Sequence, residues 1–459
     1  MNKKTLGLIA TVVVLAGVLL MPVPEGMTPA GRNCLGVLLA ALILWTTEAI
    51  PVAVTALALI ILQPIYGIAE LNTAVKEFST HVIFFVIATY GVSVAIMKTP
   101  LASRMARWLL LRSGKDPGKV ILAFVTGTAI ISSFVSNVPS TVLFMGLALS
   151  LLEPLGEKPG ESRLGRALMI AIPFGAMIGG ISTPAGSSIN ILALSMLERY
   201  AGITITFLDW MIFGIPIAIV MVPICAFMLN KIFKPNMLEK DVTEILKLEE
   251  QGSKLSIVEK KVLIIICAML IFWIASTWVP AFNVTIVAVI GLIVFFLPGI
   301  AILNWKDFSK EVGWDAILMI GGVTSIGAAV VATGLSGWFV NAVLAGLSGI
   351  NVFLLTGIVG MIINLLHLVL PIGPALVAMT IQPLSDFSVA SGINPAIFGI
   401  ITAFMAGCCM LLPLDAVPLI TYNKQYYSMG DMFKSGLAIS FVWVVIAAVW
   451  VPLAASFLG

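Results

Sequence analysis

Two stretches that could bind ions interrupt long apolar runs, one in each half of the chain. Residues 132–139 (the first tip) read SSFVSNVP, and residues 367–374 (the second tip) read HLVLPIGP. The first tip offers hydroxyl groups and an amide, whose oxygen atoms can coordinate a cation and whose hydrogen atoms can bind an anion. The second tip offers a histidine, two prolines and a glycine. The sequence therefore predicts a polar region whose two halves differ in chemistry.

The residues around these tips are those of a membrane protein. Of the 459 residues, 60% are hydrophobic and 10% are charged, whereas soluble domains carry about 25% charged residues. Apolar runs of the about 17–25 residues that a membrane-crossing helix needs recur along the chain. The net charge of +3 is small, and no basic stretch with interleaved aromatic residues suggests nucleic-acid binding. The five cysteines lack metal-site spacing, so we expect them to be small core residues.

The apolar runs predict an all-α polytopic protein with crossing helices and two re-entrant hairpins. Each hairpin carries a tip near its middle, which suits two short helices that meet at mid-membrane. The N-terminal run lacks a small-residue cleavage site, so we interpret it as the first crossing rather than a signal peptide. The hairpins are residues 120–152 and 351–386, and the eleven crossings are residues 5–22, 31–49, 51–66, 81–97, 167–195, 210–230, 261–279, 284–299, 314–331, 394–422 and 435–457.

The positive charges fit this topology when the N-terminus is cytoplasmic. Of the 25 Lys and Arg residues, 22 then lie in cytoplasmic segments and three lie outside. Membrane proteins show this enrichment on the cytoplasmic side. We therefore predict a multi-pass protein of the cell inner membrane with a cytoplasmic N-terminus and a cytoplasmic linker at residues 231–260.

The two halves of the chain resemble each other. Residues 54–68 resemble residues 284–300, and residues 81–101 resemble residues 315–335. With five crossings and one hairpin in each repeat unit, the second unit is inverted relative to the first. Inverted repeats with broken helices are typical of secondary transporters.

Two further interruptions follow the hairpins inside long crossings. They are residues 179–190 (the first break) and residues 411–418 (the second break). We expect the two tips and the two breaks to meet near the membrane midplane. Helix N-termini there can hold an anion without Lys or Arg, and freed carbonyl groups can coordinate a cation.

These features resemble the divalent-anion/sodium symporter family, the INDY-type dicarboxylate transporters. Residues 45–51 (WTTEAIP) with residues 54–56 (VTA) resemble an early scaffold stretch of that family. Ser136 and Asn137 match the start of its Ser-Asn-Thr tip motif, and residues 179–187 resemble its glycine-rich break. The layout matches over nearly the full length of the chain.

The resemblance implies a homodimer in the lipid bilayer that works as an elevator and carries a small organic anion. A fixed scaffold would comprise residues 1–118 and 261–348, and a mobile transport domain would comprise residues 119–230 and 349–459. Na⁺ would bind near the tips, at one or two sites. Carried over residue by residue, the first sodium site maps to Ser132, Ser136, Asn137 and Gly186, and the substrate contacts map to Asn137, Val138, Ser187, Gly373, Pro374 and Val417.

The chain departs from the family pattern mostly in its second half. Val138 occupies the position of the threonine in the family's first-tip motif, and residues 188–189 replace two prolines of the family's break motif. Residues 371–373 (PIG) replace the whole motif of the second tip. Asp415 occupies the position of a small residue in the family's second sodium site, and His367 occupies the position of a hydroxyl residue in that site.

His367 and Asp415 are therefore candidate coupling residues. A histidine inside a membrane protein can be a hydrogen-bonded core residue, yet ionisable groups there are functional candidates by default. Asp415 would supply the charge of a modified sodium site, or the two residues would form a pair that carries a proton or replaces the cation. We hypothesise that the second sodium is lost.

The function that these patterns favour is secondary transport of small organic anions, such as di- or monocarboxylates, and the family resemblance implies that sodium drives the uptake. Exchange of anions without sodium, or linked to protons, is the alternative. An enzyme would need a clustered catalytic set, and the chain has only two histidines. A channel fits the re-entrant hairpins but not the inverted repeats with paired breaks.

Overall fold

The computed structural model describes residues 2–242, 254–340, 342, 345–347, 349–370 and 372–457. Across these ranges the ordered elements are helices, and no strand is present. Six of the helices are long and apolar enough to cross a membrane. The all-α fold class of a polytopic membrane protein is thereby confirmed.

The chain divides into two compact units. Unit 1 contains the chain up to Ile87, Ile191–Ile205 and Gly313–Ala406, and unit 2 contains Ala88–Asn190, Thr206–Val312 and the chain from Gly407 onward. This division differs from the predicted scaffold and transport segments, because the first hairpin lies in unit 2 and the second in unit 1. The predicted segments concern movement in a membrane, and they stay a prediction.

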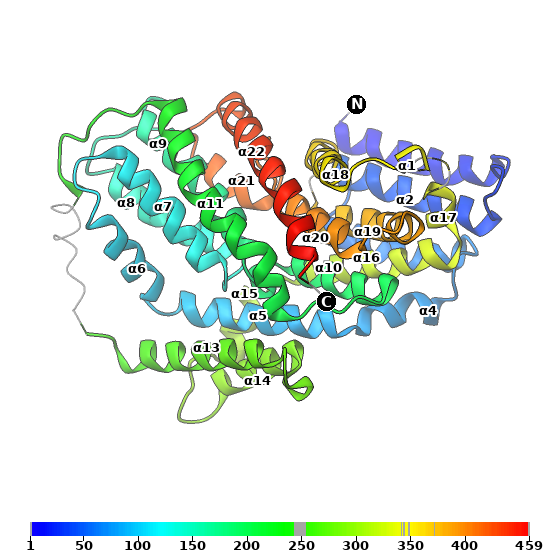
Figure 1. Cartoon of the computed structure of the whole chain (residues 1–459), viewed down its shortest axis with the longest axis horizontal. Helices are drawn as coiled ribbons and strands as arrows, with labels where there is room; N and C mark the ends of the chain where they lie inside the picture. Colours follow the sequence, from blue (N-terminus) through cyan, green and yellow to red (C-terminus); the bar gives the residue numbers. More distant parts are fainter. Residues whose placement is uncertain are drawn as a thin grey trace. The chain divides into compact units, whose positions relative to one another are not determined.

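Unit 1 is built around α16 (Trp314–Ala332), which packs against α3 (Val52–Ile65). A Cβ at Gly322 would lie 2.4 Å from the carbonyl oxygen of Ala56, so the missing side chain allows the two backbones to meet. Nε2 of Gln63 also donates a hydrogen bond to Oγ of Ser325 over 2.8 Å. The other helices of unit 1 (Figure 1) are α1 (Lys3–Leu20), α2 (Pro29–Thr47), α4 (Leu71–Lys76), α17 (Leu335–Phe339), α18 (Val352–Leu366), α19 (Gly373–Ala390), α20 (Pro395–Ala406) and most of α10 (Ser188–Ala201).

Unit 2 is built around α7 (Pro117–Ser132) and α9 (Arg163–Gly180), which lie in close contact. A Cβ at Gly179 would lie 2.0 Å from the carbonyl oxygen of Ala129. Asp116 caps α7 and Ser162 caps α9, each accepting a backbone N–H bond at the helix start. The other helices of unit 2 (Figure 1) are α6 (Leu101–Leu110), α8 (Asn137–Leu152), α11 (Phe207–Phe233), α13 (Ile257–Ala275), α14 (Val284–Phe296), α15 (Trp305–Glu311), α21 (Ala416–Tyr422) and α22 (Met429–Ala455), while α5 (His81–Met97) has residues in both units.

The helix interruptions occur where the sequence predicts them. α7 and α8 form the first helix pair, and α18 and α19 form the second. The first break separates α9 from α10, and the second break lies between α20 and α21. The insertion of the two pairs into a membrane as re-entrant hairpins stays a prediction.

Candidate functional site

The first tip joins the end of α7 to the start of α8. Oγ of Ser132 donates a hydrogen bond of 2.7 Å to Oδ1 of Asn137, and both side chains are buried. Ser136 is the N-cap residue of α8, but its side chain makes no capping hydrogen bond. The N-cap side chain therefore leaves the start of α8 open, at the positive end of the helix dipole.

The first break is held by an asparagine and a threonine inside unit 2. Nδ2 of Asn190 donates to the carbonyl oxygens of Gly180 at 2.7 Å and Thr183 at 2.9 Å. Oγ1 of Thr183 donates to the carbonyl oxygen of Ser133 at 2.5 Å. Buried backbone that leaves a helix needs such partners, so the break is an ordered structure.

The tip and the break meet at two glycines. A Cβ at Gly180 would lie 2.3 Å from Oδ1 of Asn137. A Cβ at Gly186 would lie 2.5 Å from the carbonyl oxygen of Gly180 and 3.0 Å from that of Ser132. Oxygen atoms from the tip and the break therefore surround these glycines. We call Ser132, Asn137, Gly180 and Gly186 the first half-site; oxygen ligands of this kind suit a hard cation.

The remaining predicted residues of the first half have different surroundings. Val138 is 38% exposed, and its apolar side chain offers no hydrogen bond; its role as a substrate contact stays a prediction. Oγ of Ser187 accepts the N–H of Ile189 at 3.3 Å and so helps to start α10. Ser133 and Asn190 had no predicted role. Ser133 connects the tip to the break through its hydrogen bonds with Gly179 and Thr183, whereas Asn190 holds the break itself; their polar side chains within apolar runs were the available signal.

The second break lies in the same unit as the first half-site. α21 packs against α8 and α9. Oδ1 of Asp415 accepts the N–H of Val417 at 3.0 Å, so this carboxylate caps α21. Val417, a predicted substrate contact, is buried. The chain therefore places its own carboxyl group at the start of α21.

The second tip belongs to unit 1 and is organised around His367, which is 2% exposed. Its Nε2 lies 3.1 Å from the carbonyl oxygen of Met405 and 3.0 Å from that of Ala406, and it donates to them. Nδ1 has no hydrogen-bond partner in the described part of the chain. Gly373 and Pro374 are buried at the start of α19, and Pro371 lies outside the described residues.

The predicted pairing of His367 with Asp415 stays a prediction. The two residues belong to different units. Each has partners within its own unit, which are backbone carbonyl groups for His367 and a backbone N–H for Asp415. No cluster of three or more metal-ligating side chains occurs among the residues that the structure describes.

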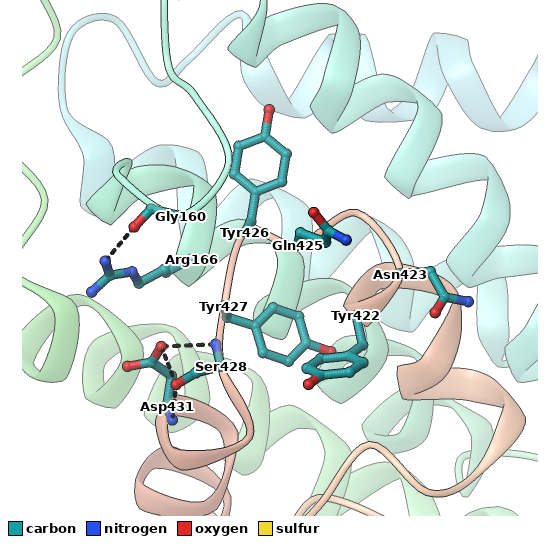
Figure 2. A pocket seen from close by; sticks show the side chains of 9 residues that line it. All are labelled: Gly160, Arg166, Tyr422, Asn423, Gln425, Tyr426, Tyr427, Ser428 and Asp431. Atoms are coloured by element: carbon teal, nitrogen blue, oxygen red, sulfur yellow. Dashed lines mark hydrogen bonds between the residues drawn. The ribbon is translucent and has the colours of Figure 1, made fainter.

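A polar pocket of about 590 Å³ lies in unit 2 beyond the C-terminal end of α21. Figure 2 shows the side chains that line it. Arg166 comes from the first turn of α9, and Asp431 comes from the first turn of α22. We call this cavity the tyrosine pocket; it is lined by Gly160, Arg166, Tyr422, Asn423, Gln425, Tyr426, Tyr427, Ser428 and Asp431.

Two solved structures share this fold. The antimetabolite efflux pump MtrF of Neisseria gonorrhoeae aligns over 99% of this chain and 94% of its own, with a TM-score of 0.59 and 13% identity. The YdaH transporter of Alcanivorax borkumensis aligns over 100% and 99%, with a TM-score of 0.57 and 12% identity. At these identities the likeness concerns the fold alone.

Relatives by sequence are similar over most of the chain. The sodium-dependent dicarboxylate transporter SdcS of Staphylococcus saprophyticus is 25% identical over 469 residues, which cover 96% of this chain and 90% of the relative. SdcS of Staphylococcus aureus strain USA300 is 25% identical over 449 residues, which cover 92% and 86%. The sequence model of the sodium:sulfate symporter transmembrane region matches residues 2–457. The predicted resemblance to divalent-anion/sodium symporters is thereby confirmed, and the chain belongs to this family of multi-pass membrane transporters, which are not enzymes.

Proposed function

We propose that this protein is a secondary transporter of small organic anions, coupled to sodium bound at the first half-site. The observation that carries this proposal is the set of oxygen atoms around Gly180 and Gly186. The carbonyl oxygens of Ser132 and Gly180 and the side-chain oxygen of Asn137 all lie against these glycines. Neutral oxygen ligands at a helix break are the usual sodium site of transporters with broken helices.

The anion would bind beside the sodium, at the open start of α8. The side chain of its N-cap residue, Ser136, makes no capping hydrogen bond. An uncapped helix start presents N–H groups and about half a positive charge, which stabilises a carboxylate without Lys or Arg. The names of the SdcS relatives support a dicarboxylate as the first anion to test.

The second half supports a modified cation site. Asp415 caps α21 with a carboxylate, so a formal charge occupies the place of a small neutral residue of the family. We propose that sodium binds at one site, near the first tip, and that His367 and Asp415 take part in coupling. The family resemblance supports a homodimer, an elevator movement of the transport domain, and an inner-membrane location with a cytoplasmic N-terminus.

The test is uptake of labelled succinate, and of labelled lactate as a monocarboxylate, into proteoliposomes that contain the full-length protein. We expect saturable uptake driven by an inward sodium gradient, which disappears when choline replaces sodium. Uptake of neither anion under a sodium gradient would contradict the proposal.

Anion exchange without sodium is a second candidate, favoured by the loss of hydroxyl residues at the second tip, where His367 now stands. Counterflow in sodium-free buffer separates the two functions. Proteoliposomes loaded with unlabelled anion would accumulate labelled anion there if the protein is an exchanger. Absence of counterflow, together with uptake under a sodium gradient, supports the symporter.

A further inference from the structure

The tyrosine pocket is separate from the first half-site and has no role in the proposed transport cycle. Asp415 caps one end of α21, whereas Tyr422 at the other end lines the pocket. Seven helical residues span about 10 Å. The pocket volume of about 590 Å³ is in the range of small-molecule binding sites, about 300–1,000 Å³.

Two opposite charges face this pocket without neutralising each other. Nη2 of Arg166 donates to the carbonyl oxygen of Gly160 at 2.7 Å, and among the described residues no carboxylate lies within 4.0 Å of its guanidinium. Oδ2 of Asp431 accepts the N–H and the hydroxyl of Ser428 at 2.9 and 2.8 Å. Figure 2 shows both groups on one side of the pocket. Gly160 holds the guanidinium of Arg166 and Ser428 holds the carboxylate of Asp431, and both groups can form further hydrogen bonds with a ligand.

The tyrosines that line the pocket are held in place by ring contacts and hydrogen bonds. The rings of Tyr422 and Tyr427 meet edge to face, with centroids 5.5 Å apart. The hydroxyl of Tyr427 donates to the carbonyl oxygen of Pro418 at 3.0 Å, and the hydroxyl of Tyr426 donates to that of Glu157 at 3.2 Å. Burial raises the pKa of both tyrosines, so they keep their protons at neutral pH.

The backbone of this pocket is strained at one wall residue. Gln425 has a φ of 59°, in the left-handed region that favours glycine. A side chain held in this conformation costs about 1–3 kcal/mol, and such residues concentrate at ligand-binding positions. The strain supports a ligand-binding role for the connection between α21 and α22.

We propose that the tyrosine pocket binds a zwitterionic α-amino acid. Its carboxylate would bind the guanidinium of Arg166, because planar Arg matches a carboxylate with paired donors. Its ammonium group would bind the carboxylate of Asp431. Its side chain would lie against the rings of Tyr422 and Tyr427. A ligand with both charges gives each of the two groups a partner of opposite charge, whereas a dianion would be repelled by Asp431.

The test is calorimetric titration of the full-length protein in detergent, in sodium-free choline buffer. The probes are glycine, L-phenylalanine, 3-phenylpropionate (which lacks the ammonium group) and phenethylamine (which lacks the carboxylate). We expect glycine or L-phenylalanine to bind saturably, at least about tenfold more tightly than either incomplete probe. No saturable binding of either amino acid, or equal binding of all the phenyl probes, would overturn the proposal.

Matched variants locate the binding to the pocket. R166Q removes the guanidinium, and D431N removes the carboxylate charge while keeping an oxygen that can cap α22. Each should weaken amino-acid binding by about tenfold or more. R163Q makes the same charge change one turn earlier on α9, at an exposed residue outside the pocket, and should bind like the wild type. R166Q binding equal to that of R163Q would overturn the proposal.

Measuring sodium-driven anion uptake by the same variants distinguishes a failure of the pocket proposal from a failure of the transport proposal. R166Q with intact uptake and lost amino-acid binding supports the pocket. Amino-acid binding that persists in a protein without anion uptake would contradict the transport proposal and leave the pocket supported.

Discussion

The helices α8 and α21 lie in contact within unit 2, yet they begin in opposite ways. The N-cap side chain of α8, that of Ser136, makes no capping hydrogen bond, whereas the carboxylate of Asp415 caps α21. The first helix start is therefore open to a negative group from outside, and the second already holds a carboxyl group from the chain. The two helix starts differ in chemistry: neutral oxygen atoms lie beside the first, and an ionisable group of the chain occupies the second.

Displacing the oxygen atoms of the first half-site should have the largest effect on transport. In Gly186→Ala the new Cβ would lie 2.5 Å from the carbonyl oxygen of Gly180 and 3.0 Å from that of Ser132, so these atoms must move. We expect the sodium concentration for half-maximal uptake to rise about 10- to 100-fold, as when a metal site loses its supporting groups. Gly146→Ala on α8 is the control, because nothing lies within 4 Å of its Cβ. Equal sodium affinity in the two variants would contradict the account.

Removing the amide of the first tip should reduce uptake about tenfold or more. In Asn137→Ala the protein loses the oxygen that lies against Gly180 and accepts the 2.7 Å hydrogen bond of Ser132. A hydrogen bond to a charged group contributes about 1.5–3 kcal/mol. Initial uptake rates at fixed sodium provide the measurement. Thr141→Val, one turn along α8, is the control, and uptake lost equally in both variants would indicate a general defect of the helix.

Two substitutions of Asp415 at the start of α21 should separate the effect of its charge from the effect of its capping hydrogen bond. Asp415→Asn keeps an oxygen for the N–H of Val417 and removes the charge, whereas Asp415→Ala removes both. We expect uptake to fall several-fold in both variants, with unchanged sodium cooperativity. The alanine variant should lose a further ~1 kcal/mol of stability from the lost cap, measured by thermal unfolding in detergent. A change of sodium cooperativity in Asp415→Asn would place a second sodium at this residue.

The histidine of the second tip should give the smallest effect at neutral pH. Gln at position 367 can still donate to the carbonyl oxygens of Met405 and Ala406, but it cannot titrate. If His367 takes part in coupling, the wild-type uptake rate should vary with pH as its imidazole gains or loses a proton, and His367→Gln should lose most of this variation. His81→Gln, at the other histidine of the chain, is the control. Identical pH profiles for wild type and His367→Gln would exclude a coupling role.

Much of the fold and part of the site can be predicted from sequence because hydrophobicity and helix-breaking residues carry the signal. Residues 120–152 and 351–386 become the two helix pairs, and the glycine-rich break ends α9 at Gly180. The hydrogen bonds from Ser133 to Gly179 and from Thr183 to Ser133 could not be foreseen. They depend on how segments about 50 residues apart pack, which no local pattern encodes.

The capping role of Asp415 and the tyrosine pocket were also not predicted from the sequence. An aspartate before a short apolar helix is a common cap signal, yet its unusual position suggested a sodium ligand instead. Three of the six tyrosines lie within residues 422–427, which signals an aromatic surface. Arg166 joins this surface only through the fold, because it comes from a helix more than 250 residues away in sequence.

The asymmetry of the two half-sites is tested most directly by the sodium dependence of initial uptake in proteoliposomes at saturating anion. The account predicts a Hill coefficient near one for the wild type, the same coefficient for Asp415→Asn, and a large loss of sodium affinity for Gly186→Ala. A Hill coefficient near two for the wild type that is unaffected by Asp415→Ala would contradict it, because two sodium sites would then operate without the carboxylate that caps α21.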